Sequence, residues 1–168
     1  MEYIADTSFF FTVFEVFLQK KGFAEYAIKE SDKVKLGELL EKEKVVYVMP
    51  SVLCELELIL RKKFVFKVIS ALRDRKIIST LEEGNEFVKE IKFLVKEFLG
   101  IVISKYEVKG TQVKVILEDA LGLYNRYYLR SSFQDCVVVA EAKNRNLCLI
   151  SFDNRQKKIA SNEECAVL

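Results

Sequence analysis

Short apolar segments alternate with longer segments of helical character along most of the chain, and this alternation strongly limits the folds the chain can adopt. Four segments, each short and rich in β-branched or aromatic residues, predict strands over 2–6, 45–49, 101–108 and 147–151. These segments are continuously apolar rather than alternating, which is typical of strands covered on both faces. The sequence therefore predicts an α/β fold with a mainly parallel central sheet.

The segments between these strands predict helices. Thr7 or Ser8 is expected to cap the first of them. Ser79 and Thr80 each stand three residues before a glutamate, as in a capping box. The expected helices run over 8–21, 23–43, 51–63, 64–75, from 79 or 80 to just before Gly100, and over 112–130 and 135–145, followed by one helical turn in the tail.

The segment "DCVVVAEAK" at 135–143 fits two structures. Three consecutive valines favour a strand. The remainder, "AEAK", favours a helix, and a helix buried on most sides would have the same composition. The pattern leaves both alternatives open.

The composition suits one globular domain over residues 1–168, because 51% of the residues are hydrophobic and 31% are charged. No apolar run reaches the length of a membrane span. Glu2 and Asp6 stand where a secretory signal would be basic or apolar. We therefore expect a cytoplasmic protein that does not associate with a membrane.

The chain contains no histidine, which excludes Ser-His-Asp triads, Cys-His pairs and histidine-ligated zinc. Catalysis of hydrolysis would have to rely on carboxylates, with hard metal ions as partners. The four cysteines form no C-x-x-C pair, so we expect buried free thiols rather than a zinc site.

Two of the predicted strands are followed by an aspartate. Asp6 follows "YIA", and Asp153 follows "LCLISF" near the other end of the chain. Because the carboxyl ends of parallel strands meet at one edge of a sheet, Asp6 and Asp153 would face the same crevice if their strands are neighbours. Each also has a simpler interpretation, a helix cap for Asp6 and an Asx-turn for Asp153.

Two further acids extend this pattern. Glu55 lies on the helix that begins near Pro50 and has no cation at helical spacing, whereas Glu57 has Arg61 four residues later. Asp135 stands at the start of a predicted helix, where the helix dipole alone would favour an anion. Clustered carboxylates repel one another, and oxygen ligands select Mg²⁺ or Mn²⁺. Together, the acids predict a divalent-metal site.

The stretches "YIADTSFFF", "MPSVLCELE" and "SFQDCVVVAEAKNRNLCLISFD" resemble, in order, the motifs of the PIN domain family of metal-dependent nucleases. The resemblance implies a three-layer α/β/α sandwich. It implies that the catalytic, metal-binding acids are Asp6, Glu55, Asp135 and Asp153, with Ser8 as a supporting contact and Mg²⁺ or Mn²⁺ as the cofactor.

The resemblance also implies hydrolysis of RNA phosphodiester bonds. Many small members of the family are VapC-like toxins that dimerise and are held inactive by an antitoxin, so RNA, an antitoxin and a second copy of the chain are the implied partners. The chain departs from this pattern in its longer helical middle, about 64–130, and in Ser151, which stands where threonine is common.

Several interpretations remain open beside the nuclease. Lys62, Arg130 and Arg155 could contact phosphates or be ordinary surface charges. The apolar helix over 8–21 could be core, or could present a surface to a partner. A catalytically silent nucleic-acid or protein binding module is the alternative function. An aspartyl-phosphate enzyme is disfavoured, because Ser8 stands where its second acid would be.

Overall fold

The computed structural model describes residues 2–22, 34, 36–38, 46–77, 79–108, 113–127 and 131–168. Its strands are β1 (Tyr3–Ala5), β2 (Val46–Val48), β3 (Glu107–Val108) and β4 (Cys148–Ile150). They form one sheet in the order β3-β2-β1-β4, and every neighbouring pair is parallel. All residues of β1, β2 and β4 are buried, which explains their continuous apolar sequences.

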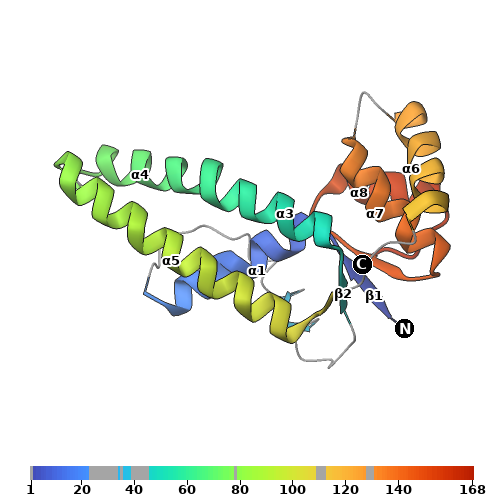
Figure 1. Ribbon diagram of the computed structural model, residues 1–168, viewed down its shortest axis with the longest axis horizontal. Coiled ribbons are helices and arrows are strands. Elements are labelled where there is room, and N and C mark those ends of the chain that lie inside the picture. Colours follow the sequence, from blue (N-terminus) through green and yellow to red (C-terminus); the bar gives the residue numbers. More distant parts are fainter. Residues whose placement is uncertain are drawn as a thin grey trace.

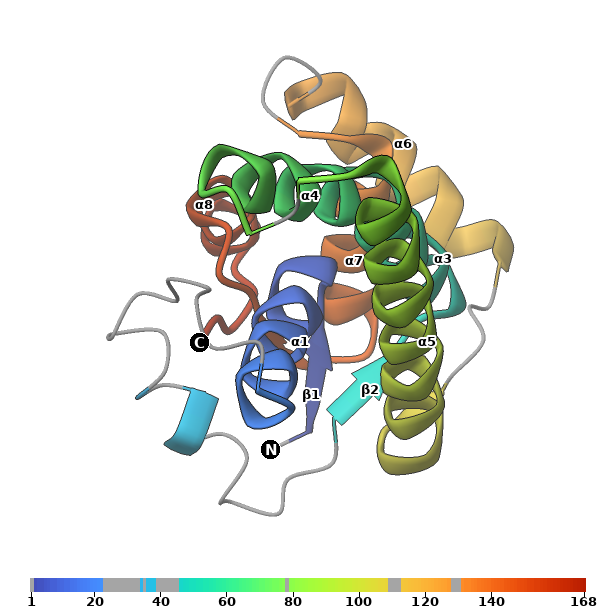
Figure 2. The ribbon, with the colours of Figure 1, turned by 90° about the vertical axis from the view of Figure 1, so that its left-hand side faces the viewer.

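The described helices are α1 (Thr7–Lys20), α3 (Pro50–Leu58), the π-helix η1 (Ile59–Phe64), α4 (Val65–Asp74), α5 (Leu81–Lys105), α6 (Val113–Tyr127), α7 (Phe133–Asn144) and α8 (Asn154–Asn162). Figure 1 shows α1 and α5 on one side of the strands, with α6 and α7 on the other. In Figure 2, α1 lies in front of β1 and α7 lies behind it. The expected three-layer α/β/α sandwich with a parallel sheet is confirmed.

Helices α4 and α5 form a long antiparallel pair that projects away from the sheet (Figure 1). The two helices expected over 51–63 and 64–75 are joined into one helical run, in which η1 takes up the boundary. The expected helix over 23–43 lies largely outside the described residues.

The strand expected over 101–108 is wrong for most of its length. Helix α5 continues through Gly100 to Lys105, and only Glu107–Val108 pair with β2. Val95, Phe98 and Val102 are all buried, and their spacing of three and four residues places them on one helical face. The β-branched residues of this segment therefore extend the apolar stripe of α5 instead of forming a strand.

The structure also settles the open choice between strand and helix at 135–143, and it shows a longer helix in the tail than expected. The segment at 135–143 is helical throughout α7, whose residues Cys136 to Ala142 are all buried, so its apolar composition reflects a helix covered on every side. The tail contains α8, a helix of nine residues, instead of a single turn.

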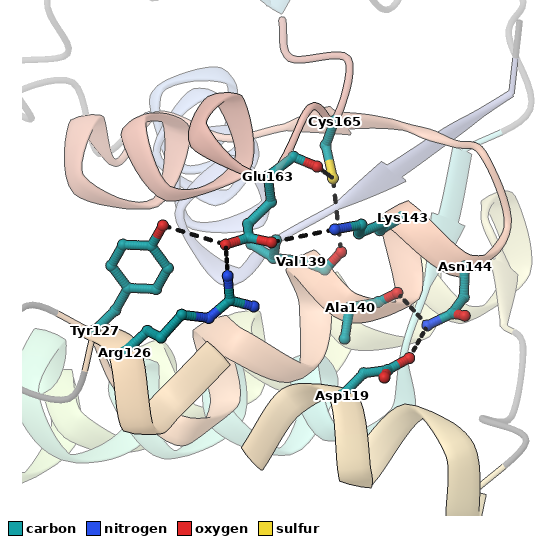
Figure 3. Close-up of polar contacts among 9 residues, drawn as sticks. All are labelled: Asp119, Arg126, Tyr127, Val139, Ala140, Lys143, Asn144, Glu163 and Cys165. Atoms are coloured by element: carbon teal, nitrogen blue, oxygen red, sulfur yellow. Dashed lines mark hydrogen bonds and ion pairs between the residues drawn. The ribbon is translucent and has the colours of Figure 1, made fainter. Parts of the chain in front are cut away.

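The C-terminal segment contacts the sheet and also the helical layer formed by α6 and α7. Val167 forms a parallel bridge with Leu149 of β4. Glu163 is 5% exposed, and its Oε1 pairs with Arg126 Nη1 at 2.9 Å and accepts a hydrogen bond from the Tyr127 hydroxyl at 3.2 Å. Figure 3 shows these contacts and the pairing of Glu163 Oε2 with Lys143 Nζ at 3.1 Å. Glu163 thus links the end of α8 to α6 and α7.

The cysteines are free thiols, as expected, but they are not all buried. Cys136 and Cys148 are buried and Cys165 is half-buried, whereas Cys54 is exposed. Cys54 lies on the solvent side of α3, because the buried residues of that helix are Val52 and Leu56. Across the described ranges, no helix has the length and apolar character needed to cross a membrane.

We expect Glu163→Gln to lower the free energy of unfolding by about 1.5 kcal/mol, because the buried carboxylate accepts charge-assisted hydrogen bonds from three side chains. Urea unfolding followed by circular dichroism measures the change. Glu164→Gln is the matched control at an exposed neighbouring position and should change stability by less than about 0.5 kcal/mol. Equal effects of the two substitutions would contradict the anchoring role.

Candidate functional site

A pocket of about 420 Å³ lies where the sheet changes its winding direction. From the central strand β1, the chain adds β2 and β3 on one side and then β4 on the other. The crevice beyond the carboxyl ends of β1 and β4 is the usual ligand position in such a sheet. The described residues that line the pocket are Asp6, Thr7, Ser8, Phe11, Thr12, Glu55, Ile59, Asp135, Phe152, Asp153 and Gln156. The structure therefore brings all four predicted acids to one pocket.

Asp6 is the acid among these four whose carboxylate oxygens both accept hydrogen bonds from described residues. Its Oδ1 accepts hydrogen bonds from the Phe9 backbone N–H at 2.9 Å and from the Ser8 hydroxyl at 2.7 Å, and its Oδ2 accepts one from Ser151 at 2.5 Å. Asp6, and not Thr7 or Ser8 as expected, is the N-cap of α1. The Asp6 carboxylate reaches the N–H three residues later, which is the usual capping geometry.

The environment of Asp6 disfavours its charged form. The residue is 3% exposed, and this burial raises the pKa of its carboxyl group. The hydrogen bonds from Ser151, Phe9 and Ser8 lower the pKa in part, while the nearby charge of Asp135 raises it. No lysine or arginine pairs with Asp6 within the described part of the chain, so its partners are all neutral donors.

Glu55 is held by a hydroxyl group. Thr7 donates to Glu55 Oε2 at 2.5 Å, and Oε1 accepts no hydrogen bond among the described residues. Glu57, two residues later, pairs with Arg61 at 2.9 Å on the surface, as its spacing predicted. The two glutamates of α3 therefore have different environments, and only Glu55 faces the pocket.

Asp135 and Asp153 each combine a capping role with a place at the pocket. Asp135 Oδ2 accepts from the Ser132 backbone N–H at 2.9 Å in a capping box at the start of α7. Asp153 Oδ1 accepts from the Arg155 backbone N–H at 2.7 Å and caps α8. Within the described chain, Asp135 Oδ1 and Asp153 Oδ2 have no hydrogen-bond partner. The simpler interpretations hold, since Asp135 lies in the first turn of α7 and Asp153 bonds the N–H two residues later as in an Asx-turn, and both acids still line the pocket.

The chemistry of these donors suits a hard divalent cation. The acids offer only oxygen ligands, three of them keep one oxygen without a hydrogen bond, and no lysine or arginine is among the described lining residues. Among those residues, however, no three acidic or thiol side chains are already gathered closely enough to hold one ion. Coordination by several of the acids would therefore require side-chain rotation, which the half-exposed Glu55 and Asp135 allow.

Serine hydroxyl groups connect Asp6 to the strand on the other side of the crevice. Ser8, the predicted supporting residue, donates to Asp6 and accepts a hydrogen bond from the Phe152 backbone N–H at 2.8 Å. Ser151 donates to Asp6 Oδ2, a contact that the sequence analysis missed. Its place at the end of a strand, two residues before Asp153, was the available signal.

The pocket contains other residues that sequence reasoning did not identify, namely Thr7, Phe11, Thr12, Ile59, Phe152 and Gln156. Gln156 stands three residues after Asp153, a spacing that places both on one side of α8 and could have indicated it. Of the predicted phosphate-binding residues, Lys62 and Arg155 are exposed and do not line the pocket, and Arg130 lies outside the described residues.

The sheet order, the helical layers and the acid-lined pocket at the switch point give the α/β/α fold that the resemblance to the PIN domain family implies. No family model matches the sequence, and no curated protein matches it either. Among solved structures, the chain is similar to the crystal structure of FitAcB from Neisseria gonorrhoeae, with a TM-score of 0.50 and 15% sequence identity. The match covers 99% of this chain and 96% of that chain, so the similarity in fold extends over the whole chain.

The raised pKa of Asp6 predicts a pH-dependent effect of Asp6→Asn in the presence of a chelator. The stability contributed by Asp6 is fully present below the ordinary pKa of 3.8 and is lost as the pH rises through the raised, folded-state value. Asparagine has no such loss, so the stability of Asp6→Asn relative to wild type should increase as the pH rises above 3.8. Urea unfolding at several pH values measures the difference.

Asp74→Asn, at the exposed end of α4, is the control and should follow the wild-type pH dependence. A stability difference between Asp6→Asn and wild type that does not change with pH would show that burial does not disfavour the charged form of Asp6.

Proposed function

We propose that the protein is a metal-dependent endoribonuclease that hydrolyses RNA phosphodiester bonds with Mg²⁺ or Mn²⁺. The observation that carries this proposal is the convergence of four carboxylates, each from a different part of the chain, on one pocket without a described cation. Divalent ions relieve the mutual repulsion of such a set. The chain has no histidine and the described lining has no lysine, cysteine or tyrosine, so the carboxylates are the acid–base groups that this pocket offers.

In this proposal, Asp6, Asp135 and Asp153 hold the principal ion, and Glu55 helps to hold a second ion or orients the attacking water. When bound, the ions supply a Lewis acid and lower the pKa of coordinated water. Ser8 and Ser151 hold the carboxylate of Asp6 in one orientation, because they donate to different oxygens of it. Thr7 holds Glu55 Oε2 in the same way and leaves Oε1 available.

A catalytically silent binding module with the same fold is the alternative function, and it predicts binding that chelators do not affect. Two observations favour the nuclease. All four acids are present and line one pocket. Glu55 has no ion pair in the described structure, although it lies on the same helix as Glu57, which has one.

Cleavage of labelled single-stranded RNA with Mg²⁺ or Mn²⁺ tests the nuclease proposal. We expect Glu55→Gln and Asp135→Asn each to reduce kcat/KM by about 100-fold or more, because the loss of a ligand should cost at least as much as the loss of a residue supporting one. Glu57→Gln is the matched control two residues away and should retain wild-type cleavage. Undiminished cleavage by Glu55→Gln and Asp135→Asn, or cleavage that persists in a chelator, would exclude the metal site.

We further propose that this ribonuclease is a cytoplasmic, homodimeric toxin that an antitoxin protein holds inactive. The resemblance of the stretches around Asp6, Glu55, Asp135 and Asp153 to the PIN domain family, many small members of which are VapC-like toxins, supports this role. So does the exposed apolar surface of the α4–α5 pair, where Phe66 is 77% exposed and Phe93 is 66% exposed, because such surface commonly contacts a partner.

Induced expression in a bacterial host tests the toxin role. Wild type should arrest growth and Asp6→Asn should not, and if a small antitoxin-like reading frame adjoins this gene, its co-expression should restore growth. Sedimentation of the purified protein tests the dimer. Growth arrest by Asp6→Asn equal to that by wild type would separate the toxicity from the acid-lined pocket.

A further inference from the structure

The pocket has an apolar wall in addition to its acids. Phe11, Ile59 and Phe152 line it beside the carboxylates. The Phe152 ring is stacked on the buried Phe9 ring, with centroids 6.3 Å apart and an interplanar angle of 6°. The backbone N–H of Phe152 donates to Ser8 Oγ, so both the ring and its backbone are held in place. This wall is a pre-positioned aromatic surface within the proposed active site.

Gln156 adds an unused polar group to the same pocket. The residue is 3% exposed, its side chain makes no hydrogen bond within the described chain, and its Nε2 is buried without a partner. A buried amide without a partner is unfavourable, so a ligand that completes its hydrogen bonds gains affinity. A half-turn of the amide exchanges the positions of its nitrogen and oxygen. Once its side chain rotates toward the pocket that it lines, Gln156 can therefore present either a donor or an acceptor to a ligand.

The ligand that suits this wall is flat, uncharged and polar at its edge. No lysine or arginine is among the described lining residues, so the wall itself does not favour a phosphate. Aromatic side chains stack on flat rings, and an amide can pair with a ring edge that carries donors and acceptors. The pocket volume of about 420 Å³ lies within the range of pockets that bind small organic groups, roughly 300–1,000 Å³.

We propose that the wall formed by Phe11, Ile59 and Phe152 binds an unpaired nucleobase, and that Gln156 forms hydrogen bonds with the edge of that base. Stacking on Phe152 tolerates any base, whereas Gln156 distinguishes one base from another. Bases inside a duplex are already stacked and paired, so the substrate is single-stranded RNA. This inference rests on the proposed ribonuclease function for placing the base beside the cleaved phosphate, but base binding itself needs neither metal nor turnover.

Neutral nucleosides test the wall without the charge of a phosphate. Saturation-transfer NMR in the presence of a chelator compares adenosine, guanosine, cytidine and uridine with ribose. At least one nucleoside should bind and ribose should not. Phe152→Leu should weaken nucleoside binding by about fivefold or more, in line with the contribution of base–aromatic stacking. Leu121→Ala, at an exposed position on α6 outside the pocket, is the control and should bind as wild type does.

Gln156→Leu tests the amide and its specificity. Leucine replaces an unpaired amide with an apolar side chain of similar size, so the melting temperature should not fall. The variant should bind the four nucleosides with more similar affinities than wild type does. In the cleavage assay, it should raise KM for the preferred RNA with little change in kcat, a division that a purely structural role would not produce.

Two results would overturn this inference: equal signals for nucleosides and ribose, or unchanged discrimination among the bases in Gln156→Leu. The outcomes also separate the inference from the ribonuclease function. RNA cleavage without nucleoside binding would contradict the base-binding proposal and support the nuclease proposal. Nucleoside binding without any metal-dependent cleavage would contradict the nuclease proposal and support the base-binding proposal.

Discussion

The hydrogen bonds that hold the buried Asp6 carboxylate between β1 and β4 connect the fold of this protein to its pocket. Asp6 follows β1, and Ser151, which follows β4, donates to its Oδ2. The Asp6 backbone N–H also continues the sheet by donating to the Ile150 carbonyl at 3.2 Å. These contacts join two segments about as far apart in sequence as the chain allows. Because Ser8 and Phe9 donate to the other oxygen of Asp6, the same carboxylate begins α1 and borders the crevice.

A cluster of acids at one pocket requires a source of positive potential even before any ion binds. Asp6, Asp135 and Asp153 stand at or within the first turn of α1, α7 and α8, respectively. A helix N-terminus carries a partial positive charge and unpaired N–H groups, both of which stabilise a carboxylate. Three helix N-termini therefore partly offset the repulsion within the cluster. Capping and a place in the proposed metal site are compatible, because capping by Asp135 and Asp153 uses one oxygen and leaves the other.

Much of this arrangement could be predicted from the sequence because it depends on local patterns. Continuous apolar segments predicted the buried strands, and an aspartate after β1 and another just beyond β4 predicted a shared crevice. The errors arose where tertiary packing overrides local preference. The β-branched segment after Gly100 was expected to be a strand, but Val102 continues the buried stripe of α5. Similarly, sequence spacing alone gives only a weak signal for Ser151 and Gln156, because the contact of Ser151 with Asp6 and the place of Gln156 at the pocket depend on the strand order and the orientation of α8.

The low sequence identity to a structure of the same fold is explained by the tolerance of buried apolar positions to substitution. At 15% identity over nearly the full length of both chains, most positions in the layers are interchangeable. A buried strand such as β1 requires apolar residues of suitable shape, and many combinations satisfy that requirement. A capped carboxylate facing a crevice tolerates fewer changes in its surroundings than an apolar core residue does, because a buried acid without its hydrogen-bond donors would be costly. Asp6 therefore depends on two hydroxyl groups and an N–H that the fold itself supplies, so its site cannot be exchanged as freely as the core around it.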